Sequence, residues 1–141
     1  MAQPEIPQRT LVNYRIRSAA NQFTWIAGLS LINLILLIAS SSIVFPTGLA
    51  IADLLASLAF GQPLAGRIAA ALGALGVVGM FAVFGYYGKK GASWAFVAGI
   101  SVYVLDGVIW GLLGDWISSG FHVLVLFFLI RDLTTRMRPA A

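Results

Sequence analysis

Long apolar runs separated by short polar or glycine-containing breaks dominate the chain. Four runs are long enough to cross a bilayer core of ~30 Å, because a helix rises about 1.5 Å per residue. They cover residues 22–45, 64–87, 92–113 and 117–131. The last run is the shortest, but Trp116 and Arg131 at its two ends can extend towards the interfaces and close the gap. The pattern predicts an all-α integral membrane four-helix bundle over residues 22–131.

A fifth apolar segment, residues 49–60, follows the first run. Ile51, Leu54 and Leu58 recur in it at helical spacing, and Pro46 and Pro63 lie on either side of it. A run of about twelve residues is too short to span a bilayer. We therefore predict a short interfacial or partly re-entrant helix in the first outer loop.

The basic residues predict how the spans are oriented. Short cytoplasmic loops and tails are enriched in lysine and arginine. Of the nine basic residues, eight fall on the side of the two chain ends: Arg9, Arg15, Arg17, Lys89, Lys90, Arg131, Arg136 and Arg138. Only Arg67 falls on the other side. We expect both termini inside, with residues 1–21 as a cytoplasmic N-terminal segment and residues 132–141 as a cytoplasmic basic tail.

Composition narrows the chemistry. Hydrophobic residues make up 60% of the chain and charged residues 10%, whereas soluble domains carry about 25% charged residues. With no cysteine and one histidine, a protein-held transition-metal site is not expected, and no sequence motif implies a cofactor. The basic residues form no stripe with interleaved aromatics, which argues against a nucleic-acid partner. Phosphate loops, nucleophile elbows and zinc-protease motifs are absent, so no residue is assigned a catalytic role, and a non-enzymatic protein is favoured over an enzyme, which stays an alternative.

Asp106 and His122 lie well inside the third and fourth predicted spans. An ionisable group at the centre of a membrane helix costs about 2.5–3.5 kcal/mol and usually finds a partner in the bundle interior. Each residue lies about eight positions from the turn that joins the two spans, so both reach a depth of ~12 Å from that turn. We predict that they meet, directly or through water, in the outer half of the membrane.

Other polar and aromatic residues are expected on the same side. The candidate ligand-binding or proton-relay residues are Asp106, His122, Arg67, Asp115, Tyr103 and Trp110. Arg67 could reach Asp106, Asp115 or Asp53 from the start of the second span. The favoured interpretation is a charge-assisted hydrogen bond that clamps two helices together. The alternative is a proton-responsive or ligand-binding site, because histidine titrates near neutral pH and Asp–His pairs occur in proton relays.

Small residues mark the expected helix-packing positions. In lipid, glycine and alanine let helix backbones approach closely, and asparagine forms hydrogen bonds between helices. The packing candidates are Gly73, Gly76, Gly79, Gly107, Gly111 and Asn33. The second span is so rich in small residues that we expect more small surface than one bundle needs for its own packing.

Residues 92–133 carry a recognisable pattern. It includes Trp94-Ala95-Phe96, Tyr103, Leu105-Asp106, Asp115-Trp116, Phe121-His122 and Arg131. This segment resembles a loosely defined group of small bacterial four-helix inner-membrane proteins with no assigned activity. The resemblance implies a bacterial inner (plasma) membrane location and draws attention to Asp106, Asp115 and His122. It implies no reaction.

Three functions fit these patterns. The first is an accessory or interaction subunit that contacts membrane lipids and associates either with copies of itself or with another membrane protein. The second is a small transporter or channel component that uses Asp106 and His122. The third is a membrane enzyme that acts on a lipid or quinone headgroup in the outer leaflet.

Overall fold

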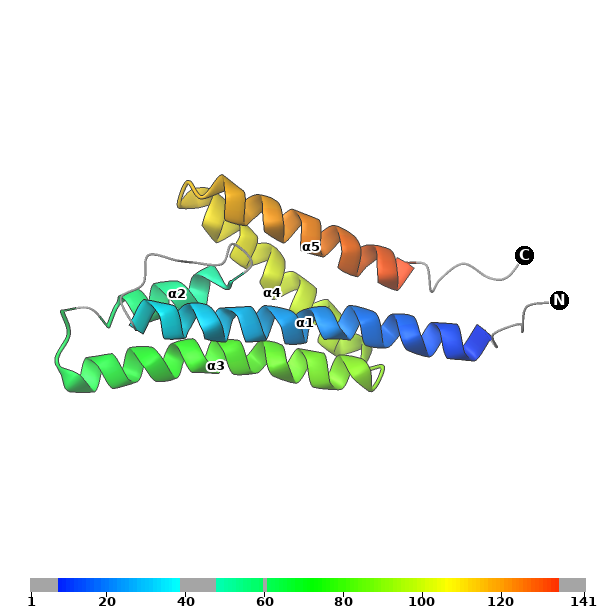
Figure 1. The fold of residues 1–141 in the computed structure, drawn as a ribbon, viewed down its shortest axis with the longest axis horizontal. Helices are drawn as coiled ribbons and strands as arrows, with labels where there is room; N and C mark the ends of the chain where they lie inside the picture. Colours follow the sequence, from blue (N-terminus) through cyan, green and yellow to red (C-terminus); the bar gives the residue numbers. More distant parts are fainter. Residues whose placement is uncertain (1–7, 39–47, 60, 135–141) are drawn as a thin grey trace.

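The computed structural model describes residues 8–38, 48–59 and 61–134, which form five helices (Figure 1). In chain order they are α1 (Gln8–Ile38), α2 (Ala50–Ser57), α3 (Leu64–Lys89), α4 (Ser93–Leu112) and α5 (Trp116–Thr134). The described residues contain no strand, so the all-α prediction is confirmed for them. The predicted end of the first span at 39–45 and the tail residues Arg136 and Arg138 lie outside this description.

Four of the helices are long and apolar enough to cross a membrane, as the hydrophobic pattern predicts. The candidate spans are Asn13–Leu36 within α1, and the whole of α3, α4 and α5. α2 has 8 residues and is far too short to cross. Its observed bounds lie inside the predicted segment 49–60. Gly61, in the connection to α3, has a φ of +78°, a conformation that glycine adopts without strain.

The first helix begins much earlier than the apolar run predicts. α1 starts at Gln8, whereas the run starts near Gln22. Hydropathy locates the part of a helix that suits lipid, but it does not locate the helix end. Ala19 and Ala20 of this segment are fully buried against the other helices, and this packing stabilises the helix before the predicted apolar run. The segment predicted as a separate cytoplasmic portion is therefore largely a continuation of α1.

The long helices form two pairs, α1 with α3 and α4 with α5, and α1 also contacts α5 (Figure 1). α1 and α3 lie side by side, α4 packs behind them, and α5 packs against α4 and α1. The start of α1, the end of α5 and the α3–α4 turn lie at one end of the molecule, which we call the termini end. α2 lies near the other end, which we call the α2 end, in contact with α1, α3 and α4.

An aromatic cluster fills the space between α1, α3 and α4. Phe23 is fully buried, and its ring lies 6.1 Å from Phe81, 6.1 Å from Phe84 and 5.9 Å from Phe96. Tilted and edge-to-face ring pairs at these distances are favourable. Gly99 of α4 makes room for Phe23, because a Cβ there would lie 2.6 Å from the Phe23 ring. The core therefore depends on a large side chain from one helix entering a space that a glycine leaves on another.

Candidate functional site

Asp106 of α4 and His122 of α5 are in direct contact. The distance from His122 Nε2 to Asp106 Oδ2 is 3.0 Å. Asp106 is 0% exposed and His122 is 1% exposed, so protein covers both side chains. Gly107 allows this approach, because a Cβ at that position would lie 2.8 Å from the Cβ of His122. The contact expected from equal distances to the α4–α5 turn is therefore present.

The second ring nitrogen of His122 fixes where one proton lies. His122 Nδ1 is 2.8 Å from the backbone carbonyl oxygen of Ser118. A carbonyl oxygen only accepts, so Nδ1 carries a hydrogen and donates it. A proton must then also lie between Nε2 and Asp106, either on the imidazole or on the carboxyl group. The pair is electrically neutral in both arrangements, which suits a site enclosed by apolar helices.

Asp106 also binds the start of α2. Its Oδ2 accepts the Ala50 N–H at 2.8 Å, and its Oδ1 accepts the Ile51 N–H at 3.0 Å. These are N–H groups of the first helical turn, which have no partner within their own helix. Asp106 therefore supplies the acceptors for two backbone donors that α2 cannot satisfy itself.

Ser30 and Trp110 complete the attachment of α2. Ser30 of α1 accepts the Leu49 N–H on its Oγ at 3.0 Å, and Trp110 of α4 donates its Nε1–H to the Gly48 carbonyl at 3.2 Å. The residue that precedes α2 is Leu49, which has no side-chain acceptor of its own. The acceptors that satisfy the start of this helix consequently come from α1 and α4.

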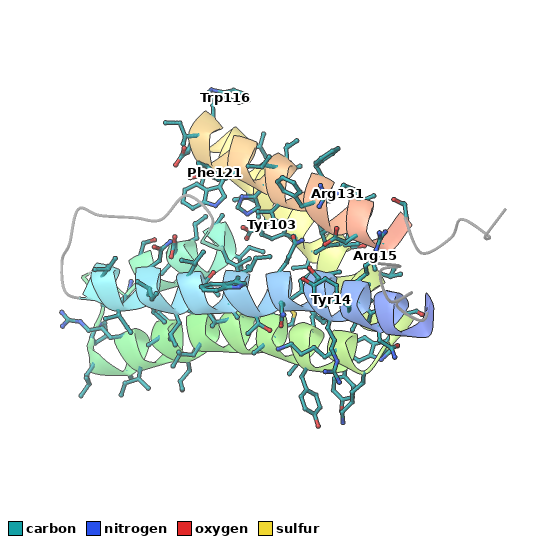
Figure 2. The ribbon with its side chains drawn as sticks, turned by 45° about the vertical axis from the view of Figure 1, so that its right-hand side comes forward. Tyr14, Arg15, Tyr103, Trp116, Phe121 and Arg131 are labelled. Atoms are coloured by element: carbon teal, nitrogen blue, oxygen red, sulfur yellow. The ribbon has the colours of Figure 1, made fainter. Side chains whose placement is uncertain are left out.

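Tyr103 packs directly on His122. The two rings are stacked, with centroids 4.2 Å apart and an angle of 20° between their planes. Tyr103 is 0% exposed, and its hydroxyl has no hydrogen-bond partner among the described residues. In Figure 2, Tyr103 lies inside the molecule, whereas Trp116 projects outward from the start of α5. The stacked tyrosine holds the imidazole plane and closes the site on that side.

Asp53 of α2 is a second carboxylate near this site. Both of its oxygens are buried, and neither accepts a hydrogen bond of good geometry from the described residues. Burial, together with the negative charge of Asp106, raises the pKa of Asp53 to about 6, and the Asn33 side chain acts in the opposite direction. Asn33 of α1 is itself buried. Two carboxylates thus occur close together, one paired with a histidine and one beside an amide.

Two of the sequence candidates lie elsewhere. Arg67 donates its Nε–H to the Gln62 carbonyl at 3.0 Å, and it forms no ion pair with any described carboxylate. The expectation that it reaches Asp106, Asp115 or Asp53 is wrong for the described structure, because Arg67 lies on an exposed part of the first α3 turn where solvent or headgroups can surround its charge. The guanidinium therefore needs no buried partner.

Asp115 has a local role at the α4–α5 turn. It accepts the Ser118 N–H at 3.0 Å and the Ser118 hydroxyl at 2.8 Å, which caps the start of α5. These hydrogen bonds lower the pKa of Asp115. Because both its oxygens serve this cap, Asp115 is not part of the Asp106–His122 group.

The glycine candidates divide into two kinds. Gly107 and Gly111 face α5, where a Cβ would lie 2.8 Å from His122 and 3.4 Å from Ser119, and Gly73 faces Leu55 of α2 at 3.5 Å. At Gly76 and Gly79 no described atom lies within 4 Å of such a Cβ. These two glycines therefore make no close helix contact within the described part of one chain.

The sequence pattern did not identify every residue of the site. Ser30 and the backbone of Leu49, Ala50 and Ile51 were missed as partners of the polar cluster. A serine in an apolar helix only weakly indicates a polar site, and nothing in the sequence shows which backbone N–H groups will bind to such a site. The absence of a capping side chain before the predicted short helix was the one available clue.

The arrangement is suited to holding helices together. Asp106 joins α2, α4 and α5, and both of its oxygens are already used. No group of three or more potential metal ligands occurs among the described residues. No protein-family model, curated protein or solved structure matches this chain.

Proposed function

We propose that this chain is a multi-pass protein of the bacterial inner membrane, with both termini in the cytoplasm, and that it acts as an accessory or interaction subunit. In this proposal the Asp106–His122 pair is structural. The observation that carries the proposal is an exposed face of α3 whose two central glycines, Gly76 and Gly79, lie close to no other helix among the described residues.

The exposed α3 face has the spacing of a helix-pairing surface. Its members recur alternately every four and three residues and are all exposed: Ala65, Ala69, Leu72, Gly76, Gly79, Val83 and Tyr86. This spacing is that of the contact positions in left-handed helix pairs, and small residues at the centre let a second helix approach closely in lipid. The space beside Gly76 and Gly79 therefore suits a helix from another chain.

The Asp106–His122 geometry supports a structural role. A relay or binding residue needs a free proton acceptor or an opening to water or lipid. Asp106 has both oxygens occupied, and His122 has both ring nitrogens in contact with acceptors. Each side chain is at most 1% exposed. An enzyme acting on an outer-leaflet headgroup would need a groove that opens beside Asp106, and such a groove would have to form by movement of α2 or α5.

The test is association of the purified full-length protein. We expect Gly76→Trp and Gly79→Trp to reduce association, measured as molar mass in detergent and as energy transfer between labelled copies in lipid nanodiscs. Gly120→Trp is the matched control, because Gly120 also has open space beside it but lies on α5. If self-association is absent, co-purification of a partner from native membranes should show the same dependence on Gly76 and Gly79. The proposal fails if both glycine variants behave like the parent in both measurements.

A small transporter or channel component is the second candidate. The observation in its favour is Asp53, a buried carboxylate beside Asp106 that could take up a proton. Proton flux in proteoliposomes tests this function. Loss of flux in Asp106→Asn and His122→Ala variants that keep the parent's stability would support it over the structural role.

A further inference from the structure

A basic cleft lies between α1 and the end of α3. Its volume is about 520 Å³, and Arg17, Lys89 and Lys90 contribute its cationic groups. Asn13 of α1 adds an amide to the lining. An adjoining hollow of about 450 Å³ shares these three cations and adds Asn21 and Tyr86. Three positive charges and two amides therefore face one concave region.

The helix geometry brings these residues together. Asn13, Arg17 and Asn21 are four residues apart and lie on one face of α1. α1 passes the end of α3 at the termini end (Figure 1), and residues of this face line the same two hollows as Lys89 and Lys90. Gly91 closes the α3–α4 turn with a φ of +82°, so the chain reverses immediately after the two lysines.

The charges of the cleft are not neutralised within the described residues. None of the described residues that line either hollow carries a carboxylate. Arg17 and Lys89 form no ion pair with a described residue, and the nearby carboxylate of Asp132 instead contacts Arg131 and Ser18. Lys90 places its Nζ 4.2 Å from the centre of the Tyr86 ring, which orients the ammonium group by a cation–π contact.

Aromatic residues indicate the depth of the cleft. Tyr87 and Trp94 lie next to the lysines with ring centroids 5.4 Å apart, and both are exposed. Exposed tyrosine and tryptophan at the end of an apolar helix are typical of the headgroup level of a membrane. Basic pockets at this level, between helices, are typical binding sites for lipid phosphates.

We propose that this cleft binds a phosphate-bearing anionic group. The arginine and two lysines supply the charge, the two asparagines supply neutral hydrogen-bond donors, and Tyr86 borders the site. The source of the phosphate is either an anionic phospholipid headgroup or free phosphate. The position beside the aromatic residues favours the headgroup. This proposal does not depend on the function proposed above.

The experiment titrates short-chain phosphatidylglycerol into the full-length protein in neutral detergent. Phosphatidylcholine of the same chain length is the comparison, because it carries a phosphate but has no net charge. Binding is measured by native mass spectrometry and by calorimetry. We expect phosphatidylglycerol to bind and phosphatidylcholine not to bind. Each cation removed should weaken binding roughly fivefold, which corresponds to ~1 kcal/mol for a basic residue near a lipid surface. The double variant Arg17→Gln/Lys89→Gln should therefore lose roughly twenty-five-fold in affinity.

The matched control is Arg15→Gln. Arg15 lies on the same helix near the same end (Figure 2) and is exposed, but it is not among the residues that line the cleft. The proposal is overturned if Arg15→Gln weakens binding as much as Arg17→Gln, because charge anywhere on α1 would then suffice. It is also overturned if the double variant binds as the parent does, or if both lipids bind alike.

A second arm identifies the source of the phosphate. Inorganic phosphate is titrated alone, under the same conditions. If it binds with an affinity similar to that of phosphatidylglycerol, and if Arg17 and Lys89 are required, the site is a phosphate site served from solution. If only phosphatidylglycerol binds, the site is a lipid headgroup site. If neither binds, there is no phosphate site.

Discussion

At the scale of single residues, Asp106 is the side chain that connects α2, α4 and α5 through buried polar contacts. One side chain satisfies two backbone N–H groups of α2 and contacts the imidazole of His122 on α5. Removing one partner from such a group leaves the other buried and unpaired, and this cost exceeds the net contribution of the intact pair. The contribution of the Asp106–His122 pair to stability is therefore better measured with single variants of its partners than judged from the 3.0 Å distance between them.

His122→Ala should lower the free energy of unfolding by roughly 3 kcal/mol, because the buried Asp106 side chain would lose its imidazole partner. The measurement is equilibrium unfolding of the full-length protein in mixed detergent micelles. Val123→Ala is the control, since Val123 is 66% exposed on the same helix. Equal effects of the two variants would contradict the structural role of the pair.

Asp53 should make stability depend on pH. Its pKa is about 6 in the folded protein, above the ordinary value of 3.8. The folded state therefore binds the proton more tightly than the unfolded state, so this residue favours folding below about pH 4. That contribution is lost as the pH rises from about 4 to about 6.

Asp53→Asn keeps the shape and removes the ionisation. We expect the variant to lose part of the decline in stability between pH 4 and pH 6, and to be more stable than the parent at pH 7. Thermal unfolding of both proteins across this range checks the expectation, and subtraction of the two curves removes contributions from other groups. A parent and a variant with parallel curves would show that Asp53 titrates normally.

At the scale of elements, α4 and α5 approach each other closely beside the polar site. Gly107 is the reason, since its missing side chain leaves room for the Cβ of His122. A Cβ is fixed to the backbone and cannot rotate away, so a larger residue must push the helices apart. Separation of α4 and α5 would in turn lengthen the Asp106–His122 contact.

Gly107→Ala should destabilise the protein by about 1–3 kcal/mol through overpacking. Gly120→Ala should stabilise it by up to about 1 kcal/mol, because alanine favours a helix and the space beside Gly120 is open. Both substitutions replace glycine with alanine, so stability changes of opposite sign would show that the cost at Gly107 comes from its contact with α5. Thermal unfolding in detergent is the measurement, and two changes of the same sign would exclude a close contact at Gly107.

At the scale of the whole molecule, four apolar helices place the start of α1 and the end of α5 at the same end (Figure 1). A chain that crosses a membrane an even number of times has both of its ends on the same side. The distribution of basic residues then predicts that this end is cytoplasmic. The basic cleft would face the cytoplasmic leaflet, where anionic lipids contribute a negative surface potential.

The absence of cysteine makes this orientation directly testable. We expect Gln62→Cys to react with a membrane-impermeant maleimide in intact spheroplasts, and Thr134→Cys to react only after the membrane is opened. Both positions are exposed, and they lie at opposite ends of the molecule. The reverse labelling pattern would show that the termini are outside.

The sequence by itself determined the helical class and the four apolar helices. It also placed Asp106 and His122 at matching depth. These features follow from the period and length of apolar runs, which depend on neighbouring residues in the chain. The ends of the helices could not be predicted as well, as the start of α1 at Gln8 shows, because polar residues can continue a helix beyond its apolar run without any change in backbone hydrogen bonding.

Only the tertiary structure decided what Asp106 binds besides His122. Its attachment to α2 joins residues 56 and 55 positions apart through backbone N–H groups, which have no sequence signature. The tertiary structure likewise separated Arg67 and Asp115 from the polar site and directed Gly107 inward while leaving Gly76 exposed. In each case the deciding quantity is the rotation of one helix relative to its neighbours. That rotation is set by the packing of all the helices together, so no local pattern of residues can specify it.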